Sequence, residues 1–114
     1  MLPCGMTDLA PIQETCGRLA ARLQGRPRES ELRATYMEMA TLTGLLHGAV
    51  GDARRVQGET DAVRAAEASL DRFKAGMRQV GLDIRLASEA ATQIGLQTAL
   101  DTAIETLEAL ETSP

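Results

Sequence analysis

Apolar residues recur at alternating steps of three and four over residues 63–94. The ten positions of this series are Val63, Ala66, Leu70, Phe73, Met77, Val80, Ile84, Ala87, Ala91 and Ile94. A period of 3.5 residues held this long is typical of a helix that lays one apolar seam against another helix. With a rise of about 1.5 Å per residue, the helix would be roughly 48 Å long. We therefore predict one unbroken helix over residues 63–94.

The composition favours narrow helix–helix packing over a thick globular core. Hydrophobic residues make up 44% of the 114-residue chain, but aromatic residues only 2%. Alanine, leucine and methionine fill the space between helices well, and this apolar content argues against disorder. The length is that of one domain. We predict an all-α single domain spanning residues 1–114.

Two further helices are expected before the long one. The first, over residues 7–25, would open at Thr7 or Asp8 and end at Gly25, because these residues are typical helix caps. Its apolar face comprises Leu9, Ile12, Cys16, Leu19 and Leu23. The second would run to about residue 57 along a seam of Leu32, Tyr36, Met39, Thr43, Leu46, Val50 and Ala53. With the helix over 63–94 it would form an antiparallel coiled-coil hairpin over 28–94.

Gly58 is the expected turn of this hairpin. Glycine suits the left-handed cap of a helix, and Thr60 or Asp61 suits the N-cap of the next one. A competing frame through Leu42, Leu45, Ala49, Asp52, Val56, Glu59 and Val63 would allow one continuous helix. We favour the hairpin, because the competing frame places Asp52 and Glu59 in an apolar seam.

A short acidic helix is predicted over residues 96–111, after a break at Gly95. Its apolar steps are two residues out of phase with the preceding seam, and no Lys or Arg lies beyond residue 97. One interpretation is that this helix docks into a partner's groove. The residues that would carry such docking are Leu100, Ile104, Leu107, Leu110, Glu105 and Glu108. The other interpretation is that it folds back over the hairpin.

Five arginines near the start of the chain are candidates for contact with double-stranded DNA. They are Arg18, Arg22, Arg26, Arg28 and Arg33. The first three lie four residues apart, so they form a stripe that could contact a phosphate backbone without sequence specificity. The same stripe could instead be a solvated face paired with Glu14, Glu29 and Glu31.

Self-association is the main functional expectation. The second helix has apolar residues beyond its seam, and Gly44, Gly48 and Gly51 line one side, where another backbone could approach closely. Apolar surface left uncovered by a hairpin favours further copies. The residues expected in the core seam or between copies are Leu32, Tyr36, Met39, Leu46, Val50, Val63, Leu70, Phe73, Met77, Val80, Ile84 and Ile94.

Chemistry is not expected of this chain. His47 has no carboxylate or serine at a spacing that would orient it, and Cys4 and Cys16 are interpreted as reduced thiols. We predict no catalytic, cofactor-binding or metal-binding residue. The net charge is −4, and neither a secretory signal nor a membrane span is recognisable. We therefore expect a cytoplasmic protein.

The order of parts resembles the small terminase subunit of tailed phages and gene-transfer agents. The resemblance lies in the basic helix with Arg18, Arg22 and Arg26, the hairpin over 28–94 and the acidic end. It implies a homo-oligomer, in some members a ring, that contacts double-stranded DNA non-specifically and recruits a large ATPase–nuclease subunit through the acidic end. No helix-turn-helix is recognisable here. Alternatives are a small coiled-coil chaperone or structural subunit of a bacterial export apparatus, and an immunity or inhibitor protein.

Overall fold

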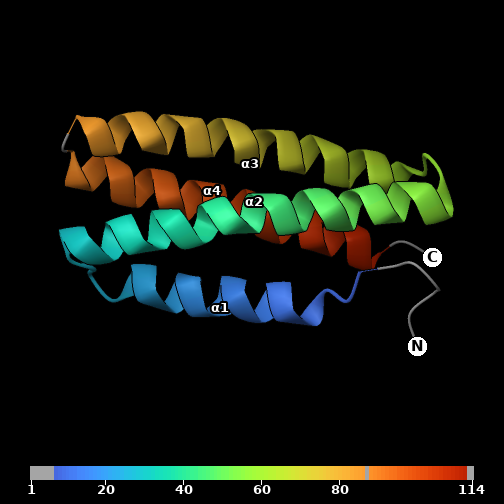
Figure 1. Ribbon diagram of the computed structural model, residues 1–114, viewed down its shortest axis with the longest axis horizontal. Helices are drawn as coiled ribbons and strands as arrows, with labels where there is room; N and C mark the ends of the chain where they lie inside the picture. The colour runs from blue at the N-terminus through green and yellow to red at the C-terminus, as the bar shows by residue number, and fades with distance from the viewer. Residues whose placement is uncertain (1–6, 87, 113–114) are drawn as a thin grey trace.

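The chain folds into four helices in the computed structural model, which describes residues 7–86 and 88–112. These are α1 (Ala10–Gln24), α2 (Glu29–Gln57), α3 (Asp61–Arg85) and α4 (Glu89–Glu111), shown in Figure 1. No strand occurs within the described residues. The all-α prediction is confirmed. Cys4 and the seam residue Ala87 lie outside the described part.

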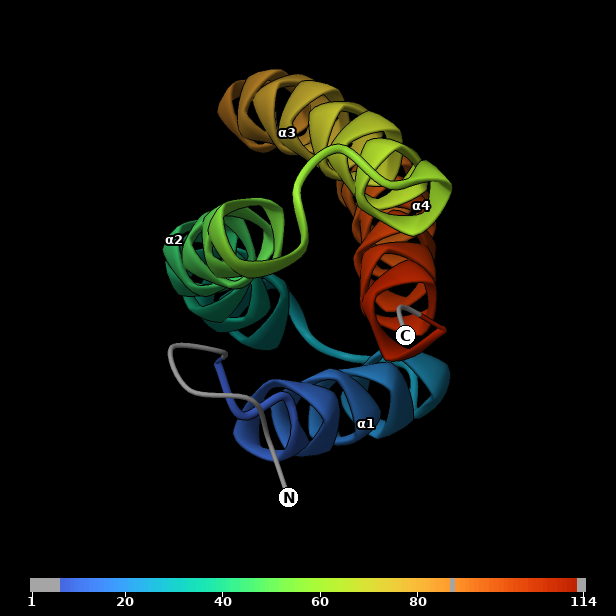
Figure 2. The same cartoon turned by 90° about the vertical axis from the view of Figure 1, so that its right-hand side faces the viewer.

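Consecutive helices run antiparallel and surround one core, as the end view in Figure 2 shows. The molecule measures 43 × 23 × 17 Å along its principal axes. The most extensive helix pair is α3 with α4, while α2 contacts both of them and α1 closes the remaining side against α4 and α2. The arrangement is an up-down-up-down four-helix bundle.

The turn at Gly58 is confirmed, and the continuous-helix alternative is wrong. Gly58 has a φ of 78°, in the left-handed region, and its N–H donates to the Arg54 carbonyl at 2.8 Å. The Thr60 hydroxyl then accepts from the Val63 N–H at 3.1 Å and so caps α3.

The prediction of one helix over 63–94 is wrong, because α3 ends at Arg85. The chain reverses between Arg85 and Glu89, and the Ser88 hydroxyl accepts from the Ala91 N–H at 3.4 Å to cap α4. Gly95 lies inside α4 rather than at a break. The helical face that buries Leu96 also buries Thr92. Ile94 lies between them in sequence but on the other side of the helix, and 68% of its surface is exposed.

Close helix approach occurs between α3 and α4 rather than along α2. A Cβ atom built on Gly95 would lie 2.8 Å from Val80 Cγ2, and one built on Gly76 would lie 3.4 Å from Ala99 Cβ. Small residues at these two crossings allow the backbones to approach, which explains why this pair packs most extensively.

The predicted seam residues build the core of a single chain. Buried members are Leu32, Met39, Leu46, Val50, Val63, Leu70, Phe73, Met77 and Val80. Tyr36 and Ile84 are half-buried and pack against this core, and Ile94 is outside it. The core therefore needs no second copy to cover these side chains.

Candidate interaction surfaces

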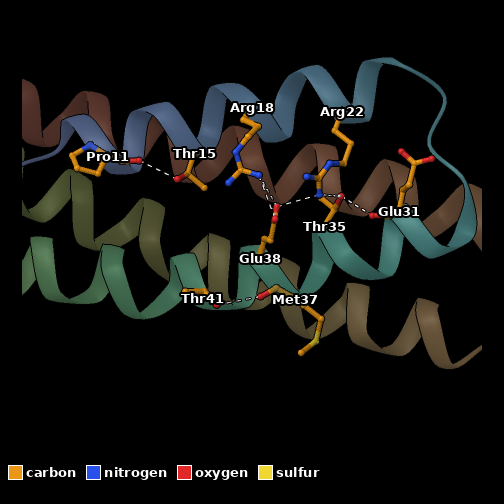
Figure 3. A network of polar contacts seen from close by, with 9 residues as sticks. All are labelled: Pro11, Thr15, Arg18, Arg22, Glu31, Thr35, Met37, Glu38 and Thr41. Carbon is orange, nitrogen blue, oxygen red and sulfur yellow. Dashed lines mark hydrogen bonds and ion pairs between the residues drawn. The ribbon is translucent and has the colours of Figure 1, made fainter.

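Two arginines of the predicted DNA stripe tie α1 to α2. Arg18 and Arg22 converge on Glu38 of α2, as Figure 3 shows, with Nη1 to Oε2 distances of 3.2 Å and 3.1 Å. Arg22 also donates to the hydroxyl of Thr35 at 3.3 Å, and that buried hydroxyl donates to the Glu31 carbonyl at 2.7 Å. These arginines therefore pair within the chain, although with Glu38 and not with the expected Glu14, Glu29 or Glu31.

The other three arginines of the set are spread over the start of α2 and the loop before it. Arg33 pairs with Glu29 at 3.2 Å on the same helix. The Arg28 backbone N–H donates to Glu31 Oε1 at 3.3 Å, and this contact helps to cap α2. Arg26 adopts a positive φ of 57° in the loop and is exposed. Arg18 and Arg22 are the two members of the set that share a partner, Glu38.

The apolar residues expected to dock α4 into a partner lie inside the bundle. Leu100, Leu107 and Leu110 are buried, and Ile104 packs partly against the core. Glu105 pairs with Arg72 of α3 at 2.7 Å, while Glu108 is exposed. The alternative in which this helix folds back is therefore the one that the structure shows, and the leucines are not available to a partner.

The few residues that could take part in catalysis or metal binding lie far apart along the chain. Cys16 is buried in the core, and burial raises the pKa of its thiol. The Thr7 hydroxyl donates to Asp52 at 2.5 Å, and this bond, with help from Arg55, lowers the pKa of that carboxyl. Lys74 Nζ lies 3.3 Å from His47 Nδ1. Among the described residues, no three His, Cys, Asp or Glu side chains gather where they could hold a metal ion.

The side of α2 that faces away from the bundle is uncharged over about five turns. We define this outer face of α2 by its exposed residues Ala34, Met37, Ala40, Thr41, Gly44, Leu45, Gly48 and Gly51. Met37 and Leu45 expose 66% and 47% of their surface. Between Arg33 and Asp52 the only acidic or basic residue other than His47 is Glu38, which turns toward α1.

The three glycines of this face have no close neighbour within the chain. A Cβ atom built on Gly44, Gly48 or Gly51 would meet nothing within 4 Å. The sequence indicated that these residues line one side of the helix, but their position on the outside depends on how α2 is rotated in the bundle.

None of the described helices is both long enough and apolar enough to cross a membrane. No protein-family model, curated protein or solved structure matches the chain.

Proposed function

We propose that this chain is a non-enzymatic, cytoplasmic helical protein that works by associating with other protein chains, first of all with a second copy of itself. The observation that carries the proposal is the outer face of α2, which is uncharged and contains three exposed glycines in the interior of a helix. The proposal assigns this face to contact between two copies.

The glycines lower the stability of the isolated chain without serving its own packing. Each one costs about 1 kcal/mol relative to alanine in a helix interior, and no neighbouring atom of the chain requires the missing Cβ. A second helix crossing at Gly44 and Gly48 could approach closely, while Met37 and Leu45 would be covered. A face that meets its own copy across a two-fold axis needs no charge complementarity, which agrees with the lack of charge here.

Mass measurement of the whole chain tests this contact. In ~0.5 M NaCl, where contacts between exposed charges are screened, we expect light scattering to show twice the 12.2 kDa chain mass. Gly48→Glu should give the monomer, because it places a charge on the face while improving helix propensity. Gly17→Glu is the matched control, since Gly17 is also exposed and open but lies on α1. A wild-type chain that stays monomeric at high concentration would contradict the proposal.

A more specific proposal is that the chain is a small-terminase-like DNA-packaging adaptor. This proposal depends on the arginines at the end of the bundle where α1 meets α2. Arg26 and Arg28 are exposed there and form no ion pair with another described residue. Because exposed ion pairs contribute only about 0–1 kcal/mol, DNA phosphates could compete with Glu38 for Arg18 and Arg22. A large ATPase–nuclease subunit would then contact the exposed acids of α4, since the leucines are buried.

This adaptor hypothesis predicts salt-sensitive binding of duplex DNA. Replacing Arg18, Arg22 and Arg26 with alanine should abolish that binding in a fluorescence anisotropy titration, because it removes the phosphate contacts. Absence of duplex binding by the oligomer at low salt would eliminate this version and leave the protein–protein proposal intact.

A further inference from the structure

An open groove separates the first half of α2 from the last two turns of α3. Its volume is about 650 Å³, and it is lined by Tyr36, Arg78, Gly81, Leu82, Ile84 and Arg85. We call it the basic groove. The Tyr36 ring lies across Gly81, where an added Cβ would come within 3.1 Å of the tyrosine hydroxyl. Leu82 keeps 45% of its surface exposed. The groove thus combines two cations with an apolar wall.

The two arginines of the basic groove are not neutralised. Arg78 and Arg85 are exposed, and neither forms an ion pair with any residue that the structure describes. Among the nearby acids, Glu29 pairs with Arg33 at 3.2 Å, and Asp83 accepts a hydrogen bond from Gln79 at 3.3 Å. This contrasts with Arg18, Arg22 and Arg72, which all reach a carboxylate. The groove therefore offers its positive charge to another molecule.

The outer side of α4 carries the complementary feature. Arg85 is the last basic residue of the chain, so α4 contains acidic residues but no basic one. Glu105 is paired with Arg72, and Glu111 accepts from Gln13. Asp101 and Glu108 are exposed, and no cation among the described residues contacts them. Asp101 accepts a hydrogen bond from Gln97 Nε2 at 3.1 Å. Together the two acids form an acidic edge.

The spacings of the two charged sets agree. Arg78 and Arg85 are seven residues apart on α3, and Asp101 and Glu108 are seven residues apart on α4. Seven residues correspond to about two turns, or about 10.5 Å along a helix axis. One helix laid along the other could therefore satisfy both arginines at once. Within one chain, α3 and α4 run antiparallel with Val80 beside Gly95 and Gly76 beside Ala99, so Arg85 lies near the start of α4, away from Asp101 and Glu108 (Figure 1). A chain therefore cannot make this contact with itself.

We propose that the basic groove of one copy binds the outer side of α4 of another copy, with Arg78 and Arg85 contacting Asp101 and Glu108. This inference rests on the proposed self-association but uses a different surface. The two patches are distinct, so the contact is head-to-tail and links pairs formed through α2 into larger assemblies. Duplex DNA is the less favoured occupant, because phosphates would leave the exposed side chain of Leu82 uncovered.

Charge reversal of the whole chain tests this contact. At low salt, native mass spectrometry of the wild type should show species larger than the dimer. Arg78→Glu with Arg85→Glu should reduce them to the dimer, and so should Asp101→Arg with Glu108→Arg. The four substitutions combined should restore them, because the charges are exchanged. The fourfold variant keeps the wild-type net charge of −4, since two reversals subtract four units and two add four, so a net-charge effect cannot explain the recovery.

The outcomes separate this inference from the proposed function. Larger species that persist in both double variants, or that fail to return in the fourfold variant, would overturn the groove contact while leaving the α2 contact untouched. Loss of the larger species in the double variants, with Gly48→Glu without effect at high salt, would support the groove contact and contradict the α2 contact. Salt-sensitive duplex DNA binding that is lost on reversing Arg78 and Arg85 would assign the groove to nucleic acid and overturn the inference.

Discussion

Single glycines have three different roles in this protein, which depend on the backbone conformation or on the space around the missing Cβ atom. Gly58 supplies a positive φ at the end of α2. Gly95 provides space for Val80 where α4 crosses α3. Gly44, Gly48 and Gly51 on α2 face open space. Only the first role follows from local sequence, because a glycine directly after an apolar helical pattern is a typical cap.

The contact between Gly95 and Val80 can be tested by adding one methyl group. Gly95→Ala should lower the free energy of unfolding by about 1–3 kcal/mol, as overpacking commonly does. Valine is stiff about χ1 in a helix and cannot easily turn away. Gly17→Ala is the control and should raise stability by up to about 1 kcal/mol, because its site is open. Urea denaturation measures both. Equal gains in the two variants would contradict the close crossing.

At the level of elements, the boundary between α3 and α4 decides what the acidic helix does. The apolar steps from residue 63 continue to Ile94, but the second apolar phase already includes Thr92, so the two overlap. The chain turns before Glu89, ahead of this overlap. Helix α4 therefore buries Leu96, Leu100 and Leu107 and leaves Ile94 exposed. Ser88 followed by Glu89 was the local signal of this start, since serine is a favoured N-cap and an acid is favoured in the first turn.

Two truncations on α4 distinguish a core helix from a docking helix. Leu107→Ala should cost about 2–5 kcal/mol of unfolding free energy, because it leaves a cavity between helices. Ile94→Ala should change stability by no more than about 0.5 kcal/mol, as expected for an exposed site, although the long-helix prediction makes Ile94 a seam residue. Thermal and urea unfolding provide the measurement. A negligible effect of Leu107→Ala would show that α4 is not part of the core in solution.

At the level of the molecule, the four helices close around one core, so only the residues on the outside of the bundle can contact a partner. The predicted seam and docking leucines are buried by packing within the chain. What remains is an uncharged face on α2, a cationic groove beside it and an acidic edge on α4. The groove adjoins the outer face of α2 at Tyr36 and Met37, whereas the acidic edge lies on α4.

The sequence alone was enough to derive the all-helical fold, the turn at Gly58 and most of the buried residues of α1, α2 and α3, because capping and apolar periodicity act within a few turns of one helix. Tertiary packing decided where α3 stops, which glycines meet a neighbour and which arginines keep a free charge. Glu38 reaches Arg18 and Arg22 only because α1 lies against α2. Pairing between helices depends on their mutual rotation, and the spacing of residues along one helix carries no information about that rotation.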